Sequence, residues 1–164
     1  MLKVKEIMDG VNAVVVRLYP DRTVYTDVLP EKFERPSFFL RPEGRKITSR
    51  TSCIVAVEQM ITIQCIDKVG DRYETETARL YDVTDTLSDA FLQRGALICG
   101  DRWLTADRID ISRSLDVADV TITVTYEDNR PAAPVTQPVV ESVGAETTPI
   151  EGKPISLLLL WCCF

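Results

Sequence analysis

Residues 52–66, Ser-Cys-Ile-Val-Ala-Val-Glu-Gln-Met-Ile-Thr-Ile-Gln-Cys-Ile, decide the fold. The stretch is rich in β-branched residues, contains neither glycine nor proline, and alternates with a period of two, which is typical of a β-strand. One side is largely apolar and comprises Val55, Val57, Gln59, Ile61, Ile63 and Cys65. The other side is mixed and comprises Ile54, Ala56, Glu58, Met60, Thr62, Gln64 and Ile66. We therefore expect a central strand with one face buried under helices and the other facing solvent or another subunit.

A first helix is predicted before this strand. Over residues 2–19, apolar side chains recur every three or four positions, which is typical of an amphipathic helix. Asp9 and Gly10 leave a β-hairpin as the alternative, because Asp-Gly is a common hairpin turn. The apolar stripe continues across this pair, so we favour the helix.

A second helix is predicted over residues 72–94. Asp71 and Glu74 occupy the positions of a capping residue and its partner, and Gly95 follows the last turn as a helix-ending glycine. The expected buried stripe comprises Tyr73, Thr77, Leu80, Val83, Thr84, Leu87, Ala90 and Phe91. The expected exposed side carries Asp82, Asp85 and Asp89.

The remaining strands are predicted from alternation between turn residues. They are expected at residues 23–27, 37–40, 102–111 and 117–126, with residues 96–99 and a turn at Gly100-Asp101 leading into the third of these. Pro42 is expected to end the second of these, so that residues 45–50 lead into the central strand as an extended hairpin. In the last strand, Val120, Ile122, Val124 and Tyr126 are expected to face inward, and Thr121, Thr123 and Thr125 outward. The predicted fold is α+β, with a mixed, mostly antiparallel sheet of about four to five strands covered by two helices.

The sequence changes character near residue 127. Five of the nine prolines follow, and the periodicity is lost, which is typical of an extended or disordered arm. We therefore expect a folded domain over residues 1–127 and a Pro-rich C-terminal arm over residues 128–164. The apolar end of this arm, residues 157–164, is interpreted either as a segment that docks in a groove on a partner or as an accident of the gene end.

Composition narrows the classes of function. The formal net charge of -6 argues against a protein that coats nucleic acid, because phosphate binding needs a local excess of cations. Histidine is absent, and the five cysteines show no C-x2-C spacing, so they are interpreted as buried free thiols in a reducing compartment. The adjacent Cys162 and Cys163 are the exception: they could bind a soft metal, but an unremarkable tail is favoured. The longest apolar run, residues 157–164, is far below the roughly 20 residues of a membrane helix. We expect a cytosolic chain that does not enter a membrane.

No motif in the chain indicates catalysis. Lys68-Val69-Gly70 lacks the pattern of a phosphate-binding loop, and no serine lies in a nucleophile elbow. The acidic residues between Asp67 and Glu74 are interpreted as helix capping, and those at Asp82, Asp85 and Asp89 as a solvated helix surface. The sequence therefore predicts no catalytic residue, no cofactor and no metal. The alternative is a small ligand-binding protein or enzyme that uses the acids from Asp67 to Glu74.

A cluster of charges precedes the central strand and predicts an interface between subunits. We expect the hairpin to project toward a neighbouring subunit or toward DNA, although such clusters are usually solvated. The adjacent Phe38 and Phe39 must point to opposite faces of their strand, so that one packs in the core and the other outside it. The candidate self-assembly residues are Arg41, Arg45, Lys46 and Arg50 in the hairpin, and Glu58 on the mixed face of the central strand.

Two short motifs carry a resemblance to a known family. Tyr25-Thr26-Asp27, followed by Pro36-Ser37-Phe38-Phe39, resembles the Tyr-Thr-acid and Pro-x-Phe-Phe pattern of the small tail-terminator or tail-completion proteins of long-tailed phages and phage-like particles. The predicted order of helices and strands fits the same family. The resemblance covers roughly residues 1–127.

The resemblance implies a structural virion protein rather than an enzyme. It implies a homo-oligomeric ring of six that caps the head-proximal end of the tail tube, ends tube polymerisation and joins the tail to the neck. The implied partners are the tail tube protein, a neck or head-closure connector protein and, in contractile tails, the tail sheath. Genomic DNA would pass through the acidic lumen without specific binding, and the virion tail would assemble in the host cytoplasm. The alternative within assembly is a head-closure or connector protein of the neck.

Overall fold

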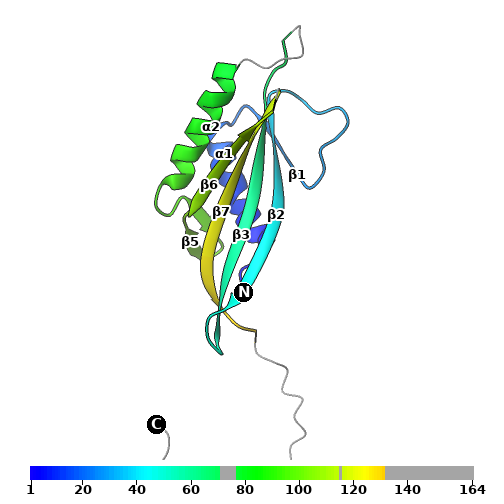
Figure 1. Cartoon of the computed structure of the whole chain (residues 1–164). Helices are drawn as coiled ribbons and strands as arrows, with labels where there is room; N and C mark the ends of the chain where they lie inside the picture. Colours follow the sequence, from blue (N-terminus) through cyan, green and yellow to red (C-terminus); the bar gives the residue numbers. More distant parts are fainter. Residues whose placement is uncertain (71–76, 115, 132–164) are drawn as a thin grey trace, which may run out of the picture. The chain divides into compact units, whose positions relative to one another are not determined.

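The computed structural model describes residues 1–70, 77–114 and 116–131 (Figure 1). Its helices are α1 (Val4–Leu18) and α2 (Thr77–Leu92). Its strands are β1 (Thr23–Thr26), β2 (Ser37–Ser49), β3 (Ile54–Ile66), β4 (Leu97–Cys99), β5 (Arg102–Leu104), β6 (Arg108–Arg113) and β7 (Val117–Asn129). The predicted α+β class is confirmed.

One five-stranded sheet organises these elements, in the order β1-β2-β3-β7-β6. β1 runs parallel to β2, and the other neighbours are antiparallel. β4 and β5 form a separate two-stranded antiparallel sheet. The predicted central strand is therefore confirmed as β3, which pairs with a long strand on either side.

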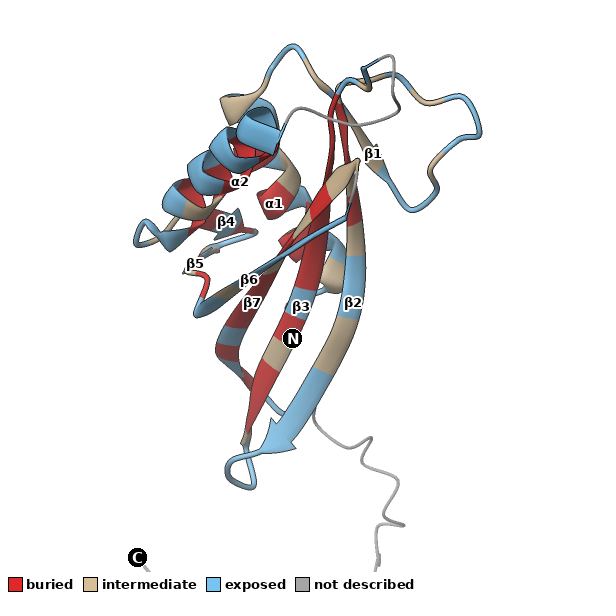
Figure 2. Ribbon diagram, turned by 45° about the horizontal axis from the view of Figure 1, so that its top comes forward, coloured by how far each residue is buried: buried red, intermediate tan, exposed pale blue. Residues whose placement is uncertain are grey.

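Both helices and the β4–β5 hairpin lie on one face of the five-stranded sheet (Figures 1 and 2). The predicted apolar side of β3 faces them and is buried at every position from Val55 to Cys65. Its one polar member, Gln59, is 1 % exposed and donates from Nε2 to the carbonyl oxygens of Gly44 and Met60, at 3.0 Å each. Buried amides need such partners, which explains a glutamine in the apolar series. Phe38 is buried on this face and Phe39 lies on the opposite one, as predicted.

The first helix is confirmed over the hairpin alternative. Its apolar stripe, Ile7, Met8, Val11, Val14 and Val15, packs into the core. Gly10 lies where α1 crosses β4 closely. A Cβ atom there would come within 2.8 Å of the Ile98 carbonyl oxygen and 2.9 Å of the Cys99 sulfur. The absence of a side chain at Gly10 therefore sets how closely the helix packs on the hairpin.

The second helix also buries the predicted stripe from Leu80 to Phe91. Thr77, which the prediction placed in the same stripe, is exposed, and its hydroxyl accepts a hydrogen bond from Nη2 of Arg113 in β6 at 2.7 Å. Asp82, Asp85 and Asp89 are exposed, as predicted. The predicted first turn, with Asp71, Tyr73 and Glu74, lies outside the described residues. The helix ends at Leu92, and Gly95 follows with a φ of +70°, in the left-handed region that suits glycine.

Pro42 does not end β2, which corrects the prediction. The strand continues to Ser49, and its register against β3 shifts between Pro42 and Arg45. β1 pairs with Ser37–Leu40, so Pro42 lies just beyond it on the outer side of β2. A proline there can leave its missing N–H on the unpaired side of the strand. The register shift absorbs the remaining irregularity as a bulge.

The predicted strand over residues 102–111 is two strands in two sheets. β5 ends at Leu104 and pairs with β4, whereas β6 begins at Arg108 and pairs with β7. The change occurs at Asp107, whose N–H donates to the Thr123 carbonyl oxygen at 2.8 Å and whose carboxylate accepts from the Thr125 N–H at 2.6 Å. β7 is also longer than predicted and pairs with β3 as far as Asn129.

Candidate assembly surfaces

The sheet face opposite the helices, here called the open face, carries the mixed side of β3. The register places the outward residues of four strands side by side on it. The Thr62 and Thr121 hydroxyls hydrogen-bond across β3 and β7 at 2.8 Å, and Met60 beside them is 37 % exposed. The open face comprises Arg41, Lys46, Thr48, Glu58, Met60, Thr62, Arg108, Asp110, Thr121, Thr123, Thr125 and Glu127.

The charges on the open face are of both signs. Arg41 pairs with Glu43 at 2.7 Å, and Arg108 pairs with Asp110 at 2.8 Å. Lys46 lies directly opposite Glu58 in the register of β2 and β3. Exposed pairs of this kind stabilise a protomer by about 0–1 kcal/mol. Their contribution to the stability of the fold is therefore small. The same charged side chains can contribute as much to a contact with a second surface.

Among the five predicted interface residues, Lys46 and Arg50 are exposed, and Arg41 and Glu58 are half-buried. Arg41, Lys46 and Glu58 lie on the open face. Arg50 is exposed in the turn that follows β2, where its N–H donates to the Ile54 carbonyl oxygen at 3.0 Å. Their assignment to a subunit interface stays a prediction.

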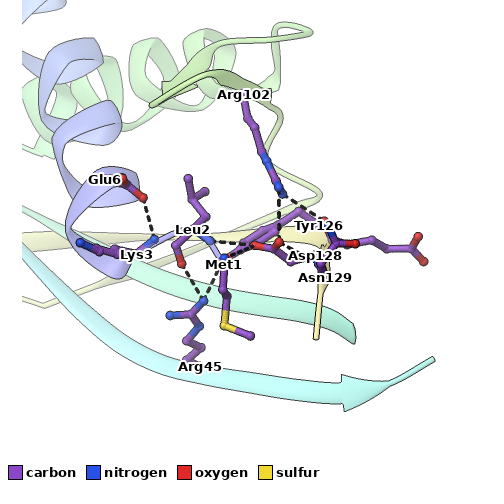
Figure 3. A network of polar contacts seen from close by, with 10 residues as sticks. Met1, Leu2, Lys3, Glu6, Arg45, Arg102, Tyr126, Asp128 and Asn129 are labelled. Atoms are coloured by element: carbon purple, nitrogen blue, oxygen red, sulfur yellow. Dashed lines mark hydrogen bonds and ion pairs between the residues drawn. The ribbon is translucent and has the colours of Figure 1, made fainter. Parts of the chain in front are cut away.

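Arg45 differs from these residues because its side chain points to the helix side of the sheet. Its Nη2 donates to the Leu2 carbonyl oxygen and to the Tyr126 hydroxyl, at 2.9 Å each (Figure 3). Arg45 therefore holds the N-terminal segment of its own protomer against β7. A charge reversal at Arg45 disturbs the protomer itself, so it no longer isolates an effect on assembly.

Asp128 is the centre of this network, and sequence reasoning missed it. Its carboxylate, only 2 % exposed, accepts from the Leu2 N–H at 2.7 Å and the Asn129 N–H at 2.8 Å, and pairs with Arg102 at 3.3 Å (Figure 3). The α-amine of Met1 lies 3.7 Å away. The alternation of β7 could have predicted this position, because two residues beyond the inward-facing Tyr126 the side chain of residue 128 again faces inward.

Burial tends to raise the pKa of the Asp128 carboxyl. The Leu2 and Asn129 N–H groups, the Arg102 guanidinium and the α-amine outweigh it and hold that pKa below its usual value. Asp128 is therefore ionised at neutral pH, and it joins the start of the chain to the end of β7.

The two long strands beside β3 differ in how their outer edges are covered. β6 covers β7 as far as Thr123, and beyond it side chains cap the edge: Asp107 accepts from the Thr125 N–H, and Arg102 donates to the Glu127 carbonyl oxygen at 3.1 Å. β1 covers β2 as far as Leu40. Residues 45–49, here called the free β2 edge, pair with β3 on one side and with no other strand among the described residues.

A cleft of about 370 Å³ opens between the C-terminal end of α1 and α2. Cationic and anionic side chains both line it, among them Arg22, Lys68, Asp67 and Asp82. Asp67 is 3 % exposed and accepts from the Lys68 N–H at 2.7 Å. Asp71 and Glu74, the other acids of the alternative ligand site, lie outside the described residues. Among the residues described, no three His, Cys, Asp or Glu side chains converge in a way that could hold a metal ion.

Cys65 and Cys99 are buried, as predicted, whereas Cys53 is exposed. Burial raises the pKa of the Cys65 thiol to about 12 and that of the Cys99 thiol to about 11. Both are therefore neutral at pH 7 and are not nucleophilic thiolates.

The helices of the described part of the chain are too short or too polar to span a bilayer.

A family model described as phage tail terminator protein matches residues 6–135. The match includes α1, α2 and the whole sheet, and it places the chain among the structural proteins of phage tails. Within that class, the chain belongs to the phage tail terminator family. A comparison with characterised proteins finds no match. The resemblance stated from the Tyr25 and Phe38 motifs is confirmed.

Proposed function

We propose that this protein forms a ring, of six subunits, that caps the head-proximal end of the tail tube, ends its polymerisation and joins the tail to the neck. Membership of the tail terminator family supports a role in the tail. The observation that carries the ring is a sheet covered on one face, with an edge on β2 and another on β6 that pair with no further strand in the part of the chain that the structure describes. Uncovered edges favour pairing with further strands, and head-to-tail association of identical copies gives a ring when the rotation between successive copies closes, and an open filament when it does not.

The partners of this ring follow from its position. Its two rims would contact the tail tube protein on one side and a neck or head-closure connector protein on the other, with the sheath added in contractile tails. The net charge of -6 per protomer disfavours adhesion of DNA that passes through the lumen. Such a protomer acts without catalysis or a cofactor, in a tail assembled in the host cytoplasm.

Deletion of the gene tests the position in the particle. Loss of a terminator should give tails of uncontrolled, excessive length by electron microscopy, because tube polymerisation no longer stops. Restoring the gene on a plasmid should return tails to a single length. Filled heads that leak DNA, beside tails of normal length, would instead identify a head-closure protein and reject the terminator role.

Charge reversal at Lys46 tests the use of the open face. Lys46→Glu should shift native mass spectra from rings toward protomers and lower the thermal unfolding temperature of the protomer only slightly, because Lys46 is exposed and the new carboxylate opposite Glu58 costs no more than about 1 kcal/mol. The matched control is Lys5→Glu, on an α1 side chain that is 83 % exposed and pairs with Asp9. Equal assembly by both variants would remove Lys46 from the interface.

A further inference from the structure

We propose that the free β2 edge of one protomer pairs, as an antiparallel strand, with β6 of the next copy. This inference rests on the proposed ring and names the contact that closes it.

Backbone hydrogen-bonding groups point outward along the free β2 edge. The Arg50 N–H donates to the Ile54 carbonyl oxygen, and antiparallel pairs alternate between bonded and non-bonded types. Lys46 and Thr48 therefore bond to β3, whereas the N–H and C=O groups of Ile47 and Ser49 face away from it. A row of unpaired groups of this kind is a template for another strand.

The outer edge of β6 offers the complementary row. The Thr125 N–H and the Glu127 carbonyl oxygen, which both bind side chains outside the ladder, show that odd-numbered residues of β7 face away from β3. Thr121 and Thr123 therefore bond to Asp110 and Arg108 of β6. By the same alternation, the N–H and C=O groups of Ile109 and Ile111 face outward.

The side chains at the two edges match. Ile47 and Ile111 are each 50 % exposed, and both belong to the helix side of the sheet, by their pairing with Val57 and Val120. When Ile47 lies opposite the neighbour's Ile109, the neighbour's Ile111 lies diagonally next to Ile47 on the helix side of the sheet. Two isoleucines that are half in water within the protomer then cover one another.

The charges favour the same register. With Ile47 opposite Ile109, Lys46 lies opposite the neighbour's Asp110, and both side chains are on the open face. Opposite charges on directly facing residues stabilise a strand pair, and like charges oppose it. The capped outer edge of β7 leaves β6 as the strand that β2 can meet.

The geometry closes a ring. β2 and β6 run in opposite directions within one sheet, so a rotation that preserves direction along the ring axis makes them antiparallel across the contact. Within one copy, Ile109 lies level with Ile61 of β3. In the register above, the neighbour's Ile109 lies opposite Ile47 and is therefore level with Val57, an offset of four residues or about 13 Å along the strands. Four strands per copy span about 19 Å across, which gives a tilt of about 35°, close to the 35–45° of closed barrels.

Proline substitution at the two edges tests the pairing. Ile47→Pro and Ile111→Pro each remove a backbone N–H that points away from the protomer's own sheet. Neither change removes a hydrogen bond within the protomer. Each should raise the concentration for half-assembly, measured by native mass spectrometry, by a factor on the order of 100. The controls Ile47→Thr and Ile111→Thr keep the backbone N–H and should still form rings. Circular dichroism checks that all four variants fold.

A mixture of the two proline variants gives the sharpest outcome. Each variant keeps the edge that the other has lost, so an equimolar mixture should form heterodimers of one copy of each, and neither homodimers nor rings. If one variant fails to fold, the charge pair decides the matter: Lys46→Glu should raise the concentration for half-assembly by a factor of about 2–10, and Lys46→Glu with Asp110→Lys should restore it.

The outcomes separate this inference from the proposed function. Wild-type rings together with rings of the proline variants would overturn the edge pairing and leave the terminator role intact. A wild-type protein that stays monomeric at high concentration, with tail tube protein present, would overturn the ring and the pairing together. Homodimers of Ile47→Pro would reject β6 as the partner of β2.

Discussion

At the scale of single residues, Asp128 illustrates how one buried carboxylate organises a terminus. It accepts two backbone N–H groups, pairs with Arg102, and is almost wholly shielded from water. A buried charge of this kind is tolerated because each of its lone pairs meets a donor. The consequence is that the segment before α1 depends on a residue more than a hundred positions away.

Replacing Asp128 by asparagine should lower the free energy of unfolding by about 2–4 kcal/mol, because Arg102 loses its anion and the new amide offers donors to other donors. Urea denaturation at pH 7 measures this. The matched control is Asp110→Asn, whose exposed pair with Arg108 should change stability by no more than about 1 kcal/mol. Equal losses in the two variants would contradict the assignment.

The acid sensitivity of the protein should change in the same variant. The folded pKa of Asp128 lies below its unfolded value of 3.8, so its contribution is fully present above that value and is lost as the pH falls through the folded pKa. The difference in unfolding free energy between wild type and Asp128→Asn should therefore be constant near pH 6–7 and shrink below pH about 4. A difference that grows on acidification would refute this sign.

At the scale of elements, α1 and β4 are held at a distance set by Gly10. Gly10→Ala should raise helix propensity by about 1 kcal/mol and still destabilise the protein by about 1–3 kcal/mol, because the new methyl group meets the rigid backbone of β4. Thermal unfolding measures the net effect. Gly44→Ala is the control, since its Cβ would meet the mobile methyl end of Met60 at 3.1 Å, and it should change stability by less than about 1 kcal/mol.

β2 shows what sequence patterning can and cannot predict. The alternation of β3 and the stripes of α1 and α2 were readable because each depends on local periodicity. The bulge between Pro42 and Arg45 depends on Gln59, which binds the Gly44 carbonyl oxygen from another strand. One extra residue reverses the faces, so Arg45 turns inward to Leu2 and Lys46 turns outward. The interface assignment stays a prediction, and Arg45, which the prediction placed on the projecting hairpin, instead contacts Leu2 and Tyr126 of its own protomer.

The split between β5 and β6 was unreadable for a related reason. Residues 102–111 contain no strong turn signal, and the break is made by Asp107, which bonds to the edge of β7. The hydrogen-bond partners of Asp107 lie on β7 and are set by tertiary structure, so the local sequence does not indicate them. The motif at Tyr25 and Phe38 identified the family because it depends on residue identity rather than on pairing.

At the scale of the whole molecule, Met1–Ala132 form one compact unit. The predicted boundary at residue 127/128 stays a prediction, although β7 runs to Asn129. A chain that ends at residue 132 should unfold at the temperature of the full chain, because it keeps the described core and the Asp128 network. A chain that ends at residue 127 should lose about 3 kcal/mol or more, since it lacks Asp128.

Calorimetry of the two truncated chains compares these boundaries directly. Similar unfolding temperatures for both would support a domain that ends at residue 127. A large loss on cutting at residue 132 would show that the fold needs residues beyond the compact unit.

The alternation along β2 has a consequence for how such a protein changes over generations. In the proposed ring, the main chain of Ile47 and Ser49 faces the neighbour while their side chains lie on the helix side, whereas Lys46 and Thr48 display theirs on the opposite surface. Main-chain recognition does not depend on which side chain is attached. Under the proposed pairing, drift on the displayed surface is therefore largely uncoupled from self-recognition, apart from the pair of Lys46 with Asp110, and a lineage can alter what that surface presents without losing the ability to assemble.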